Sequence, residues 1–539
     1  MPPHPEKWLD WAFGSDPGQS PGRLAPRFIF LRALGLIFFS AFYSLLFQVR
    51  GLIGPDGILP AAEYLQAVKQ STGVWRLWYA PTVMWFGSGS RALLVLSWIG
   101  IVVSVLLVFN FWPRMSIAVC LIVYISFIST LQVFSSYQSD GMLLSAGFIS
   151  LFFAPPGLWP GWGERHPPSR ASLFLLQLVW FTIYFESGVA KILGGDPEWR
   201  HLTAMDEYYQ NGPLPSWIGW YAQHLPHWFH VGSAGLTLAL ELVLVWGLFL
   251  PRRARIVLFW IVTPWQIGII LTSNYAFLNY LVLVLGILLL DDKYLRRLLP
   301  ARLRGPAVEP SPAPTPAKAA PEAAKARLKS NSPRMIDAIR LWIAAVFLTW
   351  VGYVIVVQLV WMLVPRVPLP SSPVAALQPF RIANEYGLFA VMTRGRYEIE
   401  FQGSDDGKNW APYPFLYKPQ DLRAAPGIFA PYQPRFDWNL WFASLDNWQQ
   451  NHFVVYTEER LLTNSRPVLS LFAANPFTAA PPRQVRAVIW QYWFTDWAEK
   501  RQGFWWRRQY LGLYAPELER EPDGKFDIVA LPQPGLPHE

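Results

Sequence analysis

Long apolar runs recur along this chain at a length that suits a lipid bilayer. A helix needs about 20 residues to cross the hydrocarbon core. Nine runs of roughly this length cover residues 28–48, 92–111, 115–134, 142–158, 171–193, 231–250, 254–273, 275–290 and 341–364. Pro155 and Pro156 break the fourth run, and the eighth is short, so either could be a re-entrant segment buried in protein. The pattern predicts an α-helical polytopic membrane bundle with about nine spans.

The composition excludes an ordinary soluble domain. Of the 539 residues, 53% are hydrophobic and 15% are charged, against about 45–50% and about 25% in soluble domains. The 29 tryptophans suit side chains at a boundary between water and lipid. The single cysteine, Cys120, lies in an apolar run, which excludes an intrachain disulfide, a CxxC redox pair and a cysteine-based zinc site.

Basic residues between the runs predict the orientation, because Lys and Arg are retained on the cytoplasmic side of a membrane. With a cytoplasmic N-terminus, the inner segments carry most of the basic residues, and the last of them, 291–340, is strongly basic. Membrane orientation explains the net charge of +9 better than nucleic-acid binding does. Residues from 365 onward should therefore lie outside, in the periplasm or a lumen.

These features predict five parts of the chain. They are a cytoplasmic N-terminal segment (1–27), a bundle of eight spans (28–298), a disordered cytoplasmic linker rich in Pro, Ala and Lys (299–340), a ninth span (341–364) and an extracytoplasmic domain (365–539). Segments rich in β-branched and aromatic residues, such as 396–401 and 485–494, alternate with turn sequences in the last part. They predict an all-β, sandwich-like domain.

Polar side chains occur at similar depth in several of the apolar runs. Such groups are costly in hydrocarbon and are therefore candidates for function. They would form one polar cavity open to the outer side, comprising Gln138, Asp140, Glu186, Lys191, Glu241 and Asn274. In a catalytic interpretation, Lys191 or Glu186 would act as a base, with Asp140 or Glu241 as a second polar group. Alternatively, each side chain only bonds a neighbouring helix or reaches the interface.

The loop between the fifth and sixth runs is rich in histidine and tryptophan. His227 and His230 have an i, i+3 spacing that would permit a shared metal ion. However, no HExxH pair is present and Pro226 interrupts the run. We expect no metal and no cofactor, and interpret the loop as an interfacial segment whose tryptophans lie among lipid head groups.

Several long stretches resemble the lipase maturation factor family. They include FLRALGLIFFSAFYSLLFQVRGLIGPDGILPA, FESGVAKILGGDPEWRHLTAMDEYYQNGPLPSWIGWYAQHLP, ANEYGLFAVMTRGRYEIEFQGSDDGKNWAPYPFLYKP and YQPRFDWNLWFASL. The resemblance covers residues from about 27 to about 516. It implies a polytopic protein of the endoplasmic reticulum membrane whose lumenal C-terminal domain helps dimeric lipases fold and leave that compartment.

We therefore expect a membrane-anchored maturation factor that acts like a chaperone and not as an enzyme. Its exported client, a lipase by resemblance, would bind an aromatic and arginine surface formed by Arg435, Asp437, Trp438 and Trp441. Membrane lipids would be further partners, and nucleic acids would not. The outer part has no cysteine and no N-x-[ST] sequon, which favours a bacterial cytoplasmic membrane over the endoplasmic reticulum.

A second hypothesis is a membrane-embedded enzyme that acts on a lipidic or quinone-like substrate. The membrane part is also distantly similar to the transmembrane domain of the vitamin K-dependent carboxylase type, mainly in the fifth run. In this hypothesis Lys191 and Glu186 do the chemistry, and the ionisable groups of the apolar runs must converge in one cavity.

Overall fold

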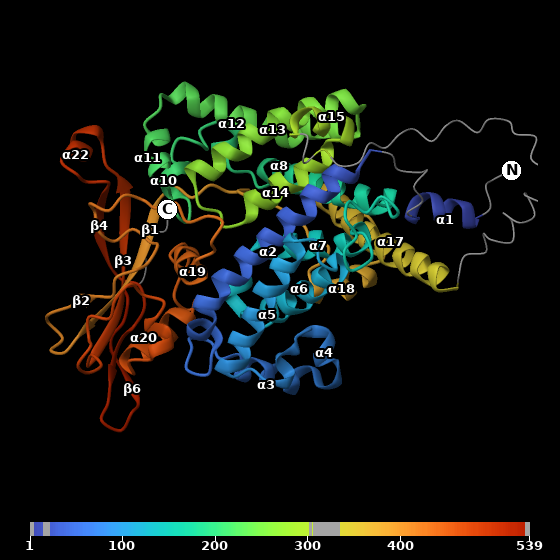
Figure 1. Ribbon diagram of the computed structural model, residues 1–539. Helices are drawn as coiled ribbons and strands as arrows, with labels where there is room; N and C mark the ends of the chain where they lie inside the picture. The colour runs from blue at the N-terminus through green and yellow to red at the C-terminus, as the bar shows by residue number, and fades with distance from the viewer. Residues whose placement is uncertain (1–4, 15–21, 301–303, 305–334, 534–539) are drawn as a thin grey trace, which may run out of the picture.

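The computed structural model describes residues 5–14, 22–300, 304 and 335–533. A helical region is followed by a domain that contains an antiparallel sheet (Figure 1). Most of the predicted linker, residues 299–340, lies outside the described residues, as does part of the predicted N-terminal segment, residues 1–27.

Six helices in the described part of the chain are long and apolar enough to cross a membrane. They are α2 (Leu24–Ile53), α5 (Ser90–Val108), α8 (Arg170–Leu193), α12 (His227–Leu242) with its continuation η4 (Leu244–Phe249), α13 (Arg252–Thr272) and α17 (Met335–Leu363). They correspond to the first, second, fifth, sixth, seventh and ninth apolar runs. The prediction of a helical membrane region is confirmed for these six runs.

The other three apolar runs form shorter helices. These are α6 (Pro113–Ile128), α7 (Gln138–Phe153) and α14 (Leu278–Gly286), which η5 (Ile287–Leu289) continues. Helix α7 ends ahead of Pro155 and Pro156, because proline disfavours helix for the residue before it and lacks the N–H that a helix needs. Most side chains of α7 are buried inside the bundle. The count of nine crossings stays a prediction.

Short helices connect the long ones. They are α1 (Pro5–Phe13), α3 (Ala61–Thr72), η1 (Gly73–Trp75), α4 (Arg76–Tyr79), η2 (Val83–Phe86), η3 (Gln132–Ser135), α9 (Pro197–Arg200), α10 (Tyr208–Asn211), α11 (Trp217–Gln223), α15 (Asp292–Leu298), α18 (Ser372–Leu377) and η7 (Gln378–Phe380). Three of them, α9 to α11, fold the loop between α8 and α12 against the sheet domain.

The sheet has the strand order β2-β1-β3-β5-β6, and β4 also pairs with β3. Its strands are β1 (Arg396–Ser404), β2 (Ala411–Pro412), β3 (Gln484–Phe494), β4 (Trp506–Leu513), β5 (Glu517–Arg520) and β6 (Phe526–Ala530). The central strands β1 and β3 pair from Arg396 opposite Tyr492 to Ser404 opposite Gln484. Side chains alternate between the two faces of the sheet.

Helices cover the face of the sheet that is turned toward the bundle (Figure 1). They are α19 (Arg435–Ala443), α20 (Phe453–Leu462) and α21 (Arg466–Leu469), while α22 (Trp497–Arg501) connects β3 and β4. Phe401 of β1 stacks against Phe436 of α19, with ring centroids 6.4 Å apart. The described residues contain a single sheet, so the sandwich prediction is wrong: the second layer is helical. A strand pattern shows that one face is covered, but not by which kind of element.

Candidate functional site

Residues 381–393 lead into the sheet domain and lie across the ends of α7 and α8 that face this domain. This segment has no regular secondary structure, so its backbone N–H groups need other partners. Four side chains supply them: Glu186 accepts from Tyr386 at 2.7 Å, Gln138 from Gly387 at 3.3 Å, Ser187 from Leu388 at 3.2 Å and Asp196 from Met392 at 2.5 Å. Polar side chains of α7, of α8 and of the loop that follows α8 thus bind a segment of the same chain.

Lys191 of α8 continues this contact. Its Nζ atom lies 2.8 Å from a carboxylate oxygen of Glu241 on α12 and donates to the Leu388 carbonyl at 2.9 Å. The Lys191 side chain is 2% exposed and that of Glu241 is 13% exposed. The Trp199 indole donates to the Phe389 carbonyl at 2.9 Å, and Lys191 Nζ lies 5.0 Å from the centre of its ring. An ion pair and an indole therefore fix the same loop.

Asn274, between α13 and α14, binds the sheet domain with both ends of its amide. Its Oδ1 atom accepts from the backbone N–H groups of Phe429 (2.7 Å) and Ala430 (3.0 Å). Its Nδ2 atom donates to the carbonyls of Gly427 (2.9 Å) and Leu214 (3.1 Å). One side chain thus joins the membrane helices, the loop between α8 and α12 and the sheet domain.

A fully buried ion pair joins α19 to α7. The two terminal nitrogens of Arg435 each donate to one carboxylate oxygen of Asp140 at 2.8 Å, and neither side chain is exposed. Tyr124 of α6 donates to the same carboxylate at 2.6 Å, and Arg435 also donates to the Phe134 carbonyl at 2.7 Å. Paired, parallel hydrogen bonds of this kind are among the strongest that side chains form.

Gln48 of α2 fixes the start of α19. Its Oε1 atom accepts from the backbone N–H of Arg435 at 2.7 Å, and its Nε2 atom donates to the Gln433 carbonyl at 2.9 Å. The first N–H groups of a helix have no partner within the helix, and here a membrane helix provides one. We did not single out Gln48 from the sequence, although an amide inside an apolar run was the available signal.

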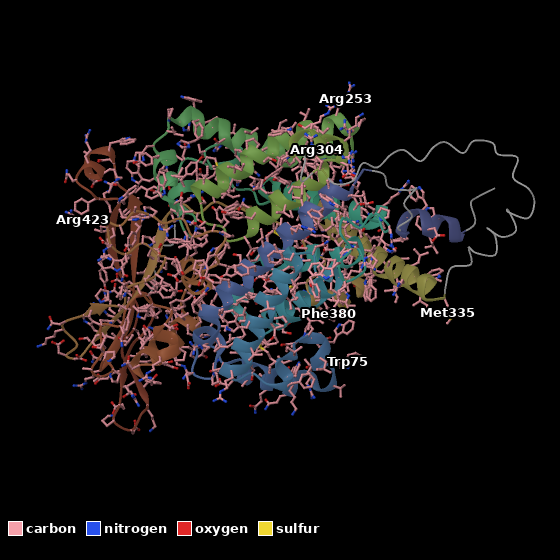
Figure 2. The ribbon with its side chains drawn as sticks, viewed as in Figure 1. Trp75, Arg253, Arg304, Met335, Phe380 and Arg423 are labelled. Atoms are coloured by element: carbon pink, nitrogen blue, oxygen red, sulfur yellow. The ribbon has the colours of Figure 1, made fainter. Side chains whose placement is uncertain are left out.

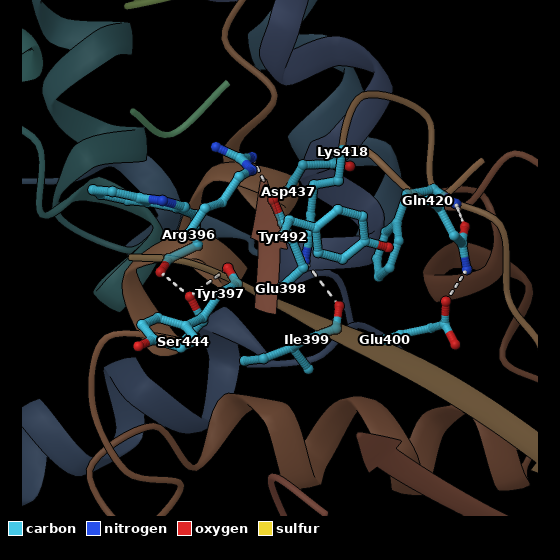
Figure 3. Close-up of polar contacts among 12 residues, drawn as sticks. Arg396, Tyr397, Glu398, Ile399, Glu400, Lys418, Gln420, Asp437, Ser444 and Tyr492 are labelled. Carbon is cyan, nitrogen blue, oxygen red and sulfur yellow. Dashed lines mark hydrogen bonds and ion pairs between the residues drawn. The ribbon is translucent and has the colours of Figure 1, made fainter. Parts of the chain in front are cut away.

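A second buried arginine attaches β1 to the loop after α10. Arg396 donates to the carbonyls of Gln210 (3.0 Å), Gly212 and Pro213 (3.1 Å). It also pairs with Glu398, whose second oxygen lies 2.9 Å from Lys418 Nζ (Figure 3). Charges buried at the joint between the two regions are therefore compensated by partners on both sides.

Comparison with known proteins agrees with a division of the chain into a helical membrane region and a sheet domain. The family model "Lipase maturation factor transmembrane domain" matches residues 25–297, and "Lipase maturation factor C-terminal domain" matches residues 382–516. Lipase maturation factor 1 of Bos taurus is 32% identical to the chain over 515 residues, with 92% of this chain and 89% of that protein covered. The chain belongs to the lipase maturation factor family. Lipase maturation factor 2 of Gallus gallus is 31% identical, with 93% and 82% covered, and no solved structure matches.

This member of the lipase maturation factor family is thus a multi-pass integral membrane protein. The interface described above joins the two regions that the family models match. Glu186 and Gln48 of the transmembrane region bind backbone groups of the C-terminal region, and Arg396 and Arg435 of the C-terminal region bind groups of the transmembrane region.

The residues that were expected to bind a client do not lie on the surface of the structure but are buried. Arg435, Asp437, Trp438 and Trp441 are 0%, 2%, 5% and 6% exposed. Trp438 stacks on Tyr137 of the membrane region, with ring centroids 4.9 Å apart. All four side chains are buried, and Arg435 and Trp438 contact the bundle directly, so we reassign these two from client contact to domain docking.

The four groups of the catalytic interpretation do not converge. Asp140 pairs with Arg435 and Glu186 binds the Tyr386 backbone, whereas Lys191 and Glu241 pair with each other. Lys191 and Glu241 line a large cavity together with Gln138, but Asp140 and Glu186 do not. The geometry therefore gives no support to a shared reaction centre of these four groups.

His227 and His230 at the start of α12 have separate protein partners. His227 contacts Asp206 at 2.9 Å, and His230 contacts the Leu225 carbonyl at 3.0 Å. No three potential metal ligands cluster within the described ranges. Trp220 is buried against Trp497 of α22 and not among lipid head groups, with ring centroids 4.9 Å apart. The interfacial interpretation is therefore wrong for this tryptophan, which is a further docking residue.

Asp437 makes the stability of the sheet domain sensitive to pH. Burial raises the pKa of this carboxyl to about 7, although Lys418 and the backbone N–H of Tyr417 oppose the shift. A raised folded-state pKa favours the protonated form, so stability is lost as pH rises through 7. We expect the free energy of unfolding to fall by about 2 kcal/mol between about pH 5.5 and about pH 8.5 from this group alone.

Thermal unfolding of Asp437→Asn across the same pH range tests this expectation. The amide keeps the shape of the acid but does not ionise, so the variant should lose that part of the pH dependence. Asp421→Asn, which changes an exposed aspartate of the same domain, is the matched control and should follow the parent protein. Equal pH profiles for the parent and Asp437→Asn would contradict the assignment.

Proposed function

We propose that the protein is a membrane-anchored maturation factor that acts like a chaperone on exported proteins, with lipases as its clients. Membership in a family whose named members are lipase maturation factors supports this proposal. The observation that carries it is the docking of the sheet domain. Buried partners from α2, α7 and α8 bind α19 and residues 381–393 on one side of this domain. On the opposite sheet face Arg396 is bound to the bundle, and the part around Trp490 is proposed for a client.

We propose nine crossings with the sheet domain outside. Contacts to that domain come from positions 48, 138–140, 191 and 274, at one end of the bundle. The intervening chain segments meet at the other end, where Arg27 donates to the His166 carbonyl, Arg114 to the Ala154 carbonyl, and Arg252 pairs with Asp291. Along the sequence, the positions at the sheet-domain end of the bundle alternate with the positions at the opposite end, as nine crossings require.

The charges support a cytoplasmic position for the end away from the sheet. Figure 2 shows Arg253 and Arg304 at this end, far from Arg423 of the sheet domain. Basic residues are retained on the cytoplasmic side. The absence of cysteine and sequons after residue 365 supports a bacterial cytoplasmic membrane, with a periplasmic sheet domain.

The sheet face opposite α19 is the proposed client surface. It comprises Trp410, Arg486, Trp490, Arg508 and Tyr510. The guanidinium of Arg508 lies 4.0 Å from the Trp490 ring and that of Arg486 lies 3.9 Å from the Trp410 ring. Trp490 pairs with Tyr510 across the strands, with ring centroids 5.1 Å apart. Aromatic and arginine side chains of this kind are typical of the energetic centres of protein interfaces.

We expect Tyr510→Ala to reduce client capture. Tyr510 is 47% exposed, and loss of a central aromatic contact of about 2 kcal/mol lowers affinity by about 30-fold. The measurement is photo-crosslinking of a secreted lipase to the full-length protein, together with the activity of the lipase released. Tyr456→Ala is the matched control, because this tyrosine of α20 is 41% exposed and lies in the helical layer. Equal capture by both variants would contradict the proposed surface.

A further inference from the structure

A pocket lies where the end of α2 meets the sheet domain (Figure 1). Its volume is about 590 Å³, within the range of about 300–1,000 Å³ that is typical of small-molecule sites. Helices α2 and α5 form one wall, and residues 416–417, 432–437 and 470–471 of the sheet domain form the other. The pocket shares no lining residue with the cavity beside Lys191 or with the proposed client surface.

The wall formed by α2 is apolar and reaches the outside of the bundle. Tyr43 and Phe47 line the pocket and are 43% and 55% exposed, and Leu416 on the opposite wall is 46% exposed. Both α2 and α5 are candidate membrane spans. Because exposed apolar side chains of spanning helices contact lipid, the pocket is open to the membrane.

Arg50 adds a positive charge to the pocket at the level of the lipid head groups. It follows the end of the first apolar run, residues 28–48, by two positions, so it lies where the hydrocarbon ends. Its side chain is exposed and forms no ion pair with a carboxylate of the described residues. A guanidinium in this position is suited to bind a phosphate group.

Three tyrosines line the same pocket and favour a cation. The rings of Tyr43 and Tyr432 are inclined at 80° with centroids 6.3 Å apart, and Tyr417 lies 5.3 Å from Tyr432. Aromatic faces carry partial negative charge and attract ammonium groups. Asp437 adjoins them, because its Oδ1 atom accepts from the Tyr417 N–H at 3.3 Å. Since Asp437 is 2% exposed, it acts on a cation through its field and not by contact.

We propose that this pocket binds the head group of a zwitterionic phospholipid from the surrounding membrane. Arg50 binds its phosphate, the tyrosines contact its ammonium group, and its acyl chains lie along Tyr43 and Phe47 of α2. A phospholipid with a glycerol head group offers a phosphate to Arg50 but no cation to the tyrosines. The bound lipid connects α2 to the sheet domain. The proposal does not depend on the identity of the client or on the orientation of the chain in the membrane.

The test uses the full-length chain in nanodiscs made of phosphatidylglycerol. One sample contains a small fraction of phosphatidylethanolamine with a photoreactive diazirine in its acyl chain, and the other contains phosphatidylglycerol with the same modified chain. We expect the first probe to label residues 43–47 and 416–417 about ten-fold more than the second, as mapped by mass spectrometry. Trp260 of α13, which is 48% exposed, is the internal reference and should be labelled equally by both probes. Equal labelling of the pocket would overturn the proposal.

Two arginines provide a matched pair of variants for the phosphate contact. Arg50→Gln removes the charge in the pocket and should reduce labelling by the phosphatidylethanolamine probe by about ten-fold. Arg91→Gln removes an exposed arginine at the start of α5 that does not line the pocket. It should leave the labelling unchanged, and equal effects of the two variants would overturn the assignment of Arg50 to the phosphate.

A tyrosine variant tests the ammonium contact and retains the apolar wall. Tyr43→Leu removes an aromatic face and should reduce the preference for phosphatidylethanolamine over phosphatidylglycerol by about five-fold. Tyr79→Leu is the control, because Tyr79 of α4 is 60% exposed and does not line the pocket. A role in the shape of the pocket alone would change labelling by both probes equally. An unchanged preference in Tyr43→Leu would therefore overturn the assignment of the tyrosines to the ammonium group.

Discussion

Arg435→Ala is expected to destabilise the protein by about 3–5 kcal/mol, because it leaves the Asp140 carboxylate buried without its charged partner. The pair has no exposed surface, and its guanidinium also binds the Phe134 carbonyl. Thermal unfolding in detergent, followed by tryptophan fluorescence, measures the loss. Limited proteolysis should at the same time release the sheet domain from the bundle.

Arg483→Ala is the control for the loss of an arginine from the same domain. It breaks a pair with Glu519 in which the arginine side chain is 68% exposed, and exposed pairs contribute about 0–1 kcal/mol. The double variant Asp140→Asn with Arg435→Met should be less destabilised than Arg435→Ala, because no unpaired charge remains. If Arg435→Ala unfolds at the same temperature as Arg483→Ala, the pair does not hold the domains together.

The membrane helices could be predicted because the bilayer sets their length. The six long helices coincide with apolar runs, and the prolines at 155 and 156 marked the end of α7. The single-layer sheet was harder to predict. Phe401 would face a covered side of the sheet whether the second layer is another sheet or a set of helices. The identity of the covering layer therefore depends on long-range packing.

The role of Arg435 could not be read from its neighbours in the sequence. A helix with arginine, aspartate and tryptophans suits an exposed binding surface as well as a docked one. What decides between them is Asp140, which is 295 positions away in the chain. The same holds for Glu186, whose partner is the backbone of Tyr386, 200 positions later. The sequence singled out the polar residues in the apolar runs as candidates for function, but their partners are set by the tertiary fold.

Lys191→Met is expected to cost about 3–5 kcal/mol, because it leaves Glu241 facing the cavity without its partner. The loss of the bond to the Leu388 carbonyl should also loosen residues 381–393. The temperature of thermal unfolding and the amount of active lipase released should both fall in this variant. A matched variant, Glu241→Gln, removes the other charge and should have a similar effect, because it leaves the Lys191 ammonium buried and unpaired.

The double variant Lys191→Met with Glu241→Gln separates an architectural role from a catalytic one. Replacement of both charges removes the unpaired ion, so stability should recover by most of the amount lost in the single variants. If the pair only positions the loop, lipase release recovers with stability. If Lys191 acts as a base, the double variant is stable but releases no active lipase, and the architectural assignment is wrong. The geometry favours recovery, because Lys191 is already engaged by Glu241 at 2.8 Å and by the Leu388 carbonyl at 2.9 Å.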